Sequence, residues 1–328
     1  MKAMILLLGA SGYVGRSFAS ELRRRGLSFI PLTRRAFDYT RFDFLFDYLR
    51  TMKPVFLINA ASYPGGGQGA GADGEREKMM AANALLPQMI ARVCLMTKTP
   101  WGHLSSGSIY SGGKVMENGN FRVEHDLGLP ELSALYARHP EKFRGFTELD
   151  EPNFSFRQGT ANFYSGTKAL GEEAIQGVGQ SYIWRLREPF NERDEPRNLL
   201  RQLESKETLC DHLDSFSHLE ECVRACLDLW EGNAPYGIYN VTNPGWLRAS
   251  EVLESLQHVF NSRSARHLGP AYEDAQAHCI LDVTKLLKNG VKLRPIQDAF
   301  ADSVERLRAV LRPVKSFASA SACHVFLS

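Results

Sequence analysis

The first half of the chain alternates short apolar runs with longer amphipathic stretches. Met4–Leu8 is apolar without interruption, which is typical of a strand buried on both faces of a parallel sheet. Further apolar runs end at Leu32, at Ile58 and near Ser106, and helical patterns of apolar positions lie between them. This alternation predicts an α/β fold with a Rossmann-type, doubly wound parallel sheet.

The second half returns to this sheet and then continues into a smaller unit. Ile183–Arg187 and Gly237–Val241 have the pattern of strands, and Leu219–Glu231 between them is helical. Two amphipathic helices follow, Ser250–Phe260 and Ile296–Leu311.

These patterns predict how the chain divides into domains. We expect a nucleotide-binding Rossmann domain over 1–185, to which the segment 209–242 returns. The segments 186–208 and 243–315 should form a smaller C-terminal α/β domain that binds the substrate. Residues 316–328 should be a flexible tail.

Composition excludes several classes of protein. The 328 residues carry a net charge of only +2, which argues against nucleic acid and acidic membranes as partners. No apolar run reaches the ~20 residues of a membrane span. The six cysteines form no Cys-x-x-Cys and the nine histidines no zinc-like spacing. We therefore predict a cytoplasmic protein without a structural metal.

A glycine turn follows the first strand. Gly9, Gly12 and Gly15 are spaced as Gly-x-x-Gly-x-x-Gly, with Ser11, Tyr13 and Val14 between them, and a helical pattern begins directly afterwards. A strand, a glycine turn and a helix N-terminus together form a binding site for a dinucleotide pyrophosphate.

The end of the second strand indicates which dinucleotide binds. Arg34 and Arg35 stand where an NAD-preferring fold usually has an acidic residue, and their guanidinium groups suit a 2′-phosphate. We therefore favour NADP(H) over NAD(H), which makes the first domain an NADP-binding domain. The alternative is that both arginines are solvated charges in a loop without a role in cofactor binding. Asp38, next to Tyr39, is a candidate hydrogen-bond partner of the adenine amine.

Further cofactor contacts are predicted at the third strand and in the next helix. Asn59, Ala60 and Ala61 end the strand with side chains of modest size, which leave room for a cofactor. Asn83 lies inside a helix, where asparagine is unfavourable, so either a buried hydrogen bond or simple solvation explains it.

The candidate catalytic chemistry lies at Tyr164 and Lys168. Four residues apart, they share one face of a predicted helix over Phe163–Gln176. An ammonium near a phenol is expected to lower the pKa of the phenol from ~10. Ser106, at the end of the fourth strand, could orient a carbonyl group, although turn chemistry also explains a serine there.

The segment 111–156 is long, polar and dotted with prolines. We interpret it as an insertion on the catalytic face, with one helix over Pro130–Arg138. The glycine-rich segment Gly65–Gly74 is a second candidate loop over the substrate.

Taken together, the motifs resemble a known family. The glycine turn, Asn59-Ala60-Ala61, Ser105-Ser106 and the run from Tyr164 to Glu172 have the order and spacing of extended short-chain dehydrogenases, within the NAD-dependent epimerase/dehydratase superfamily. Within it, the chain looks most like dTDP-4-dehydrorhamnose reductases and plant-type nucleotide-rhamnose synthase epimerase/reductases, through segments such as Trp184–Pro189 and Gly237–Gly245.

The resemblance implies roles for individual residues. Ser106 would hydrogen-bond the substrate oxygen, Tyr164 would be the acid, and Lys168 would hold the nicotinamide ribose and tune Tyr164. Arg197 and Asn198 fall where the nucleotide sugar would be recognised, and Gly107 and Ser108 would adjoin it. Arg187 ends a predicted strand, where it could meet a phosphate or form a salt bridge.

Departures from the family narrow the expected reaction. Gly107-Ser108 replaces the acidic pair of the 4,6-dehydratases, and Ser108 and Gln202 replace the cysteine and lysine associated with epimerisation. What remains is NADP(H)-dependent reduction of the 4-keto group of a nucleotide-activated deoxysugar. The alternatives are a 4-epimerase that retains NAD and a non-catalytic, NADP-binding regulatory subunit. A homodimer through two long helices would follow the habit of the superfamily.

Overall fold

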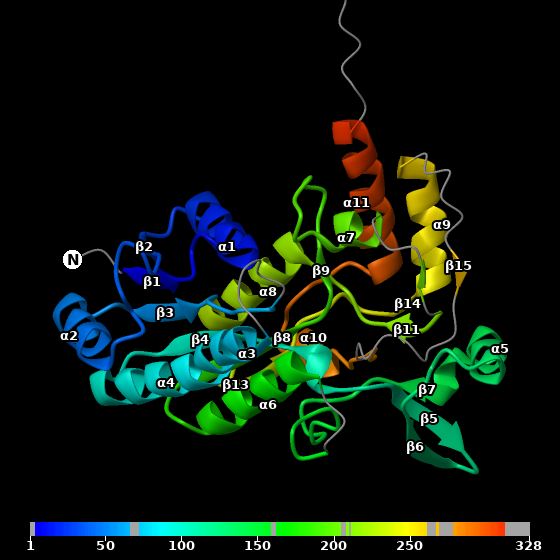
Figure 1. The fold of residues 1–328 in the computed structure, drawn as a ribbon, viewed down its shortest axis with the longest axis horizontal. Helices are drawn as coiled ribbons and strands as arrows, with labels where there is room; N and C mark the ends of the chain where they lie inside the picture. Colours follow the sequence, from blue (N-terminus) through cyan, green and yellow to red (C-terminus); the bar gives the residue numbers. More distant parts are fainter. Residues whose placement is uncertain are drawn as a thin grey trace, which may run out of the picture.

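A six-stranded parallel sheet forms the centre of the protein, as seen in a computed structural model (Figure 1). The structure describes residues 4–65, 72–158, 162–204, 208–209, 211–260, 267–268 and 278–311. The predicted tail over 316–328 and most of the predicted loop Gly65–Gly74 lie outside these residues. The strands of the sheet are β1 (Ile5–Leu8), β2 (Phe29–Leu32), β3 (Phe56–Asn59), β4 (Trp101–Ser106), β8 (Ser181–Leu186) and β13 (Gly237–Asn240).

The strand order is β13-β8-β4-β3-β1-β2, so the direction of winding reverses between β1 and β3. Ligands of open α/β sheets bind outside the carboxyl ends of the strands at such a reversal. The predicted doubly wound, Rossmann-type parallel sheet is therefore confirmed, and its reversal point lies directly beside the glycine turn.

Helices cover both faces of the sheet (Figure 1). Phe18 of α1 and Cys222 and Cys226 of α8 belong to the core on one face, and Leu45 of α2, Ile90 of α4 and Ile175 of α6 belong to the core on the other. The helices are α1 (Tyr13–Arg24), α2 (Phe42–Met52), α3 (Ala72–Met80), α4 (Leu86–Thr97), α6 (Phe163–Ile175) and α8 (Leu219–Glu231). By length and composition alone the continuous helix Ala72–Thr97 could span a membrane; apolar residues of its second half, such as Ile90 and Val93, are buried in the core against the sheet.

A smaller helical unit lies beyond the carboxyl edge of the sheet. Leu200, Leu253 and Phe300 belong to its separate core. Its elements are β9 (Pro189–Phe190), α7 (Leu199–Glu204), β10 (Thr208–Leu209), β11 (Leu213–Asp214), β12 (Ser217–His218), β14 (Leu247–Arg248), α9 (Ala249–Phe260), β15 (His267–Leu268) and α11 (Ile296–Leu311). One segment of the predicted range 243–315 packs elsewhere: Leu286 of α10 (Thr284–Lys288) and Val291 lie in the core of the large domain.

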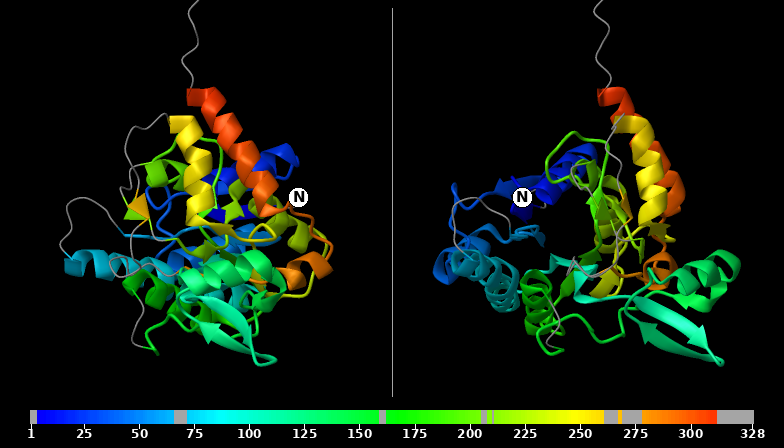
Figure 2. Two further views of the ribbon diagram at one scale, coloured as in Figure 1. Left: turned by 90° about the vertical axis from the view of Figure 1, so that its right-hand side faces the viewer. Right: turned by 45° about the vertical axis from the view of Figure 1, so that its right-hand side comes forward.

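The segment 111–156 forms a lobe of its own, which projects beside the small unit (Figure 2). It contains β5 (Gly113–Glu117), β6 (Asn120–Glu124), α5 (Pro130–Arg138) and β7 (Phe143–Arg144). Its apolar side chains, among them Val115, Leu132 and Phe143, pack with Leu213 and Ile280 of the C-terminal half. The predicted helix Pro130–Arg138 is confirmed with the same bounds.

Helix α6, which carries Tyr164 and Lys168, approaches its neighbour closely at a glycine. Between α3 and α4 the backbone widens into a π-helical turn, Ala81–Leu85. A Cβ atom on Gly171 would lie only 2.1 Å from the carbonyl oxygen of Asn83 in this turn. A side chain at this position would therefore push α6 away from the turn.

Replacing Gly171 by alanine should consequently destabilise the fold. We expect the free energy of unfolding to fall by about 1–3 kcal/mol, because the new methyl group meets rigid backbone. Urea denaturation followed by circular dichroism measures this change. The control is Leu170→Ala on the exposed side of the same helix. Equal stabilities of Gly171→Ala and the wild-type protein would contradict the packing described.

Candidate active site

The glycine turn after β1 brings two backbone segments into contact at the reversal point. Gly9 has φ +73°, and a Cβ atom there would lie 2.5 Å from the backbone nitrogen of Ala61 after β3. A Cβ on Gly15 would lie 2.1 Å from the carbonyl oxygen of Gly9. Both positions therefore require glycine. Burial raises the pKa of the Tyr39 hydroxyl, and the backbone N–H of Gly9, which donates toward its oxygen, opposes this shift.

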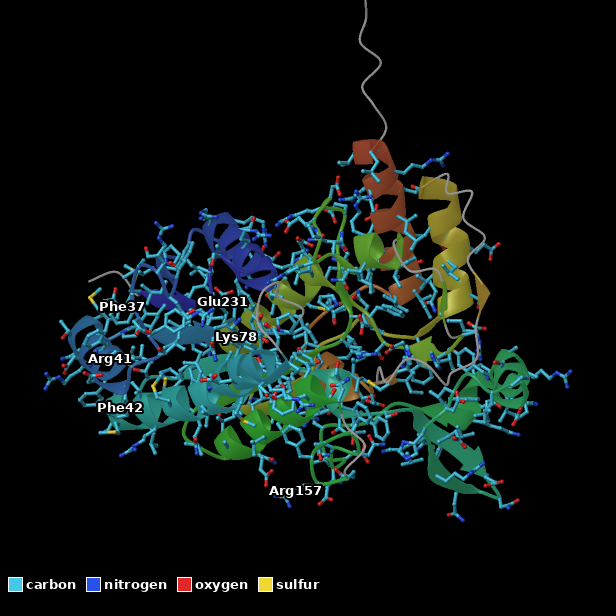
Figure 3. All side chains as sticks on the ribbon, in the orientation of Figure 1. Phe37, Arg41, Phe42, Lys78, Arg157 and Glu231 are labelled. Atoms are coloured by element: carbon cyan, nitrogen blue, oxygen red, sulfur yellow. The ribbon has the colours of Figure 1, made fainter. Side chains whose placement is uncertain are left out.

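A cavity of about 1300 Å³ opens at this point. It is lined by Gly9, Ser11, Gly12, Tyr13, Arg34, Arg35, Asp38, Tyr39, Ala60 and Ala61, all of which the sequence predicted to contact the cofactor. Lys78 of α3, which the sequence analysis missed because no motif marks it, lines the cavity as well (Figure 3).

The cavity suits a dinucleotide phosphate. In the described part of the chain no side chain caps the N-terminus of α1, so the helix end is available to an anion. Arg34 and Arg35 are exposed, and neither forms an ion pair with another described residue. The donor groups therefore fit NADP(H).

The side chains of Asn59 and Asn83 are buried next to this cavity and form hydrogen bonds within the protein, but neither residue lines the cavity. The amide oxygen of Asn59 accepts a hydrogen bond from the Ala61 nitrogen at 3.1 Å, and its amide nitrogen lies 3.1 Å from Nδ1 of His103. Burial and the nearby charge of Lys168 hold the pKa of His103 well below its usual range, so this ring is neutral. Asn59 thus has a structural role and lines neither cavity, and its cofactor contact stays a prediction.

Asn83 has a similar structural role. Its side chain is buried, accepts hydrogen bonds from the Ser62 hydroxyl at 3.0 Å and the Tyr63 nitrogen at 2.9 Å, and donates to the Thr167 hydroxyl at 3.2 Å. It thereby joins the loop after β3 to α6. The buried hydrogen-bonding alternative is confirmed for Asn83, and the residue is not among those that line the cavity.

A second cavity of about 300 Å³ adjoins the first and contains the candidate catalytic residues. Ser106, Tyr164 and Lys168 all line it, together with Ser108 and Gln202. The two cavities share the lining residues Gly12, Tyr13, Ala60, Ser62 and Arg197. A cofactor in the larger cavity would therefore adjoin a substrate in the smaller one. Val14 lines the smaller cavity, whereas Gly15 acts only through the close approach described above.

Tyr164 lies in the first turn of α6, which the side chain of Asn162 caps by accepting a hydrogen bond from the Ser165 nitrogen at 2.8 Å. Burial raises the pKa of Tyr164, while hydrogen bonding to Ser106 and the charge of Arg187 oppose this shift. Lys168, which was expected to lower this pKa, is not among the groups that shift it, and desolvation dominates. The phenol is protonated at neutral pH, which is the state required of a proton donor.

Lys168 is almost completely buried below the pocket. Its ammonium group donates a hydrogen bond to the carbonyl oxygen of Leu104 in β4 at 3.0 Å. Desolvation lowers its pKa to about 8, and the carboxylate of Glu172 opposes this shift. Because the group is neutral above pH 8, its charge changes within the range of pH in which enzymes are assayed.

Ser106 is part of a chain of hydrogen bonds that leads away from the pocket. Its hydroxyl donates to Oγ of Ser108 at 3.0 Å, and Nη1 of Arg187 donates to the same Ser108 oxygen at 2.8 Å. Arg187 forms a two-pronged ion pair with Asp214, at 2.8 and 2.5 Å. Of the two roles left open for Arg187, the structure contains the salt bridge, not an arginine exposed to a phosphate.

The remaining substrate predictions have mixed outcomes. Arg197 is exposed and lines both cavities, as expected of a residue that meets a nucleotide sugar. The buried side chain of Asn198 instead donates to the carbonyl oxygens of Asn191 at 2.6 Å and Arg193 at 2.7 Å. Gly107 packs under Leu281 and lines neither cavity. Asn198 and Gly107 therefore shape the backbone around the site.

None of the described residues of the segment 111–156 lines either cavity. Part of its apolar surface packs against the C-terminal half, whereas Phe156 packs on Phe163 at the start of α6. The interpretation of this segment as an insertion on the catalytic face stays a prediction. Periodicity predicted the helix correctly but could not indicate which surface would cover it.

Glu188 is a pocket residue that sequence analysis missed. It lines the catalytic cavity directly after β8, and its carboxylate lies 3.2 Å from Nη1 of Arg187. Its backbone φ of +38° is in the left-handed region, which is strained for a residue other than glycine. Such strain occurs preferentially at functional sites. Backbone strain leaves no pattern in a single sequence.

One cluster has spacing that could hold a cation. Glu192, His218 and Glu220 each offer a ligand atom within 4.8 Å of the others. The Glu192 and Glu220 carboxylates are already engaged: His218 lowers the pKa of Glu192 to about 2, and Arg193 lies 3.1 Å from Glu220. This arrangement is explained by ion pairing alone.

The fold and site together define the class of protein. The parallel sheet has a glycine turn at its reversal point and a Ser–Tyr–Lys set at its carboxyl edge. These features are those of an NAD(P)-dependent extended short-chain dehydrogenase/reductase. Residues 1–309 match the family described as RmlD substrate binding domain, and the chain belongs to that family.

Several relatives carry related names. The chain is 26% identical over 250 residues to a bifunctional dTDP-4-dehydrorhamnose 3,5-epimerase/dTDP-4-dehydrorhamnose reductase of Arabidopsis thaliana, covering 76% of this chain and 73% of that one. It is also 25% identical over 250 residues to a trifunctional UDP-glucose 4,6-dehydratase/UDP-4-keto-6-deoxy-D-glucose 3,5-epimerase/UDP-4-keto-L-rhamnose-reductase of the same plant. The match covers 76% of this chain and 33% of that enzyme. The predicted resemblance to nucleotide-sugar reductases and epimerase/reductases is confirmed.

Solved structures show the same fold. The UDP-rhamnose synthase of Acanthamoeba polyphaga mimivirus superimposes with a TM-score of 0.74 at 18% identity, covering 93% of this chain and all (100%) of that one. A dTDP-4-dehydrorhamnose reductase from Bacillus anthracis in complex with NADP has a TM-score of 0.69 at 18% identity, covering 94% and 100%.

The buried ammonium of Lys168 predicts a dependence of stability on pH. Its pKa in the folded protein, about 8, is below the value near 10.4 in the unfolded chain, so the unfolded state binds more protons between these values. Stability should therefore rise with pH above 8. Relative to Lys168→Met, the wild-type protein should gain about 2 kcal/mol of unfolding free energy between pH 7 and 9.5. Urea denaturation at both values measures this gain, and parallel pH profiles would contradict it.

Proposed function

We propose that the protein reduces the 4-keto group of a nucleotide-activated deoxysugar with NADPH. The observation that carries this proposal is that Ser106, Tyr164 and Lys168 line one pocket, which shares a wall with the cavity at the glycine turn. The names of the relatives support a nucleoside diphosphate 4-keto-6-deoxyhexose as the substrate class. The cytoplasmic location and a homodimer remain predictions.

Each of the three candidate catalytic residues has a separate role in the proposed reduction. When bound, NADPH supplies the hydride that reduces the ketone carbon. Tyr164 donates its proton to the carbonyl oxygen, so that the ketone becomes an alcohol and the phenolate recovers a proton from solvent. Ser106 orients and polarises the carbonyl group. Lys168, directly below, adds positive charge when protonated, and by resemblance to the family would hold the nicotinamide ribose.

Arg34 and Arg35 support the choice of NADPH. Both line the cofactor cavity at the end of β2, and both are exposed. Lys78 adds a third cation to the lining of the same cavity. This concentration of positive charge suits a cofactor with an additional phosphate group.

Reduction without epimerisation is supported by the composition of the catalytic pocket. Ser108 and Gln202, the positions associated by resemblance with a cysteine and a lysine of the epimerase step, both line this pocket. A hydroxyl and an amide are poor proton-transfer groups at neutral pH. Incubation with the keto-sugar in D₂O should therefore leave C3 and C5 without deuterium beyond the background exchange of the free sugar.

Tyr164→Phe tests the proton donor. We expect kcat with NADPH and a panel of nucleotide 4-keto-6-deoxyhexoses to fall about 10²- to 10⁴-fold, because the proton donor is lost. The affinity for NADPH, measured by fluorescence titration, should stay close to that of the wild-type enzyme.

Two results would contradict this assignment. A wild-type enzyme that binds NADPH but reduces none of the sugars is not the proposed reductase. Full biological activity of Tyr164→Phe would favour the regulatory-subunit alternative. Tightly held NAD released on denaturation would instead favour the 4-epimerase.

Arg34→Ala and Arg35→Ala test the cofactor preference. The loss of one charged contact to a 2′-phosphate should lower kcat/KM for NADPH about ten- to a hundredfold and leave kcat/KM for NADH nearly unchanged. The control is Arg41→Ala, which removes an exposed arginine paired with Asp43 outside the cavity. Equal losses with both cofactors would contradict recognition of the 2′-phosphate.

A further inference from the structure

We propose that Arg187 and Ser108 are positioning residues that connect a fixed positive charge to Ser106 through a relay of hydrogen bonds. The relay runs from Nη1 of Arg187 to Oγ of Ser108 over 2.8 Å, and the two serine hydroxyls are 3.0 Å apart. It ends at the hydroxyl that meets the substrate carbonyl. The inference rests on the proposed function, because it assigns the relay to the reduction of that carbonyl group.

The positive charge at the start of the relay is held rigidly. The side chain of Arg187 is only 3% exposed, and its Nε and Nη2 atoms both bond the Asp214 carboxylate. Asp214 in turn accepts hydrogen bonds from the backbone nitrogens of Ser215 at 2.8 Å and Cys279 at 3.2 Å. The guanidinium group therefore cannot swing into the pocket to meet a phosphate without breaking a buried ion pair, which is costly.

Its remaining nitrogen, Nη1, faces the catalytic side. Nη1 reaches Ser108 and also lies 3.2 Å from the carboxylate of Glu188. Two carboxylates thus surround one buried cation, and the Ser108 hydroxyl connects this cation to Ser106 by hydrogen bonds. Ser108 is held in place additionally by its backbone nitrogen, which donates to Oγ of Ser106 at 3.2 Å.

When substrate binds, Ser106 and Ser108 can exchange the roles of donor and acceptor in the hydrogen bond between their hydroxyl groups. In the structure the Ser106 hydroxyl donates to Ser108. The Ser108 oxygen already accepts from Arg187, and its own proton is free to rotate. When Ser106 donates to the substrate carbonyl, Ser108 can donate to Ser106 in exchange. Ser108 then accepts from Arg187 and donates to Ser106, while Ser106 accepts from both the hydroxyl and the backbone nitrogen of Ser108 and donates to the substrate.

A chain of donors with a cation at its end strengthens the last bond. Successive hydrogen bonds polarise one another, most effectively where water is excluded. Negative charge develops on the carbonyl oxygen as hydride adds to the carbon, and the polarised Ser106 hydroxyl stabilises it there. The relay therefore acts mainly in the transition state, and its loss should lower kcat rather than raise KM.

Three serine substitutions test the relay in the full-length enzyme. Ser108→Ala removes the middle hydroxyl, and Ser108→Thr keeps it. Ser111→Ala is the matched control, since it lies in the same loop and bonds Asn153 only through its backbone. Steady-state kinetics with NADPH and the best keto-sugar of the panel give kcat and both KM values.

We expect kcat of Ser108→Ala to fall about ten- to a hundredfold, below the effect of removing a direct oxyanion donor. Both KM values should change less than about threefold. Ser108→Thr should recover most of the rate, and Ser111→Ala should match the wild-type enzyme. An unchanged kcat in Ser108→Ala, a loss that Ser108→Thr does not restore, or a loss confined to KM would overturn the relay. Failure of the wild-type enzyme on every sugar would instead overturn the proposed function and the relay together.

Discussion

The burial of the Lys168 ammonium against the carbonyl oxygen of Leu104 is the contact on which the candidate site depends. Removing a charge from water is expensive unless partners compensate for it. Here a strand carbonyl and, at longer range, Glu172 do so, while Glu172 is itself paired with the buried Arg185 at 2.6 Å. The catalytic helix is thereby joined to the carboxyl edge of the sheet by polar contacts that a shift of α6 along β4 would break.

Much of this arrangement could be predicted from the sequence because it depends on local patterns. Buried parallel strands leave continuous apolar runs, and amphipathic helices leave a 3.6-residue period, so Pro130–Arg138, Leu219–Glu231 and Ile296–Leu311 were predicted with the bounds that the structure has. The roles of Gly9 and Gly15 could be predicted because only glycine fits where two backbone segments approach this closely. Ser106, Tyr164 and Lys168 follow from motif spacing, and the structure brings all three to one pocket.

Several contacts could not be predicted because the sequence does not show which partner, near or far along the chain, a polar side chain will meet. An arginine at the end of a strand looks the same in sequence whether it meets a phosphate or Asp214, which is 27 residues away. Asn198 and Asn59 have polar side chains near the site but use them on neighbouring backbone, and no pattern separates these roles. The direction of the Tyr164 pKa shift was missed because helical spacing reveals a neighbouring charge but not the extent of desolvation. The strained backbone of Glu188 has no signature in sequence at all.

The path of the chain between its two cores also bears on synthesis at the ribosome. Strand β13 and helix α8, which complete the large sheet and cover Phe18 and Trp184, follow the segment that first enters the small unit. The small unit in turn lacks Ile296 and Phe300 until the last described helix emerges. The core under α1 and α8 and the core of the small unit cannot close while the chain is still short, whereas the core under α2, α4 and α6 lacks only Ile238 once residue 183 has been made. A nascent polypeptide therefore exposes one apolar face of the sheet for much of its translation. Chaperone demand should consequently be high for this chain, and N-terminal fragments should aggregate instead of folding as an independent Rossmann domain.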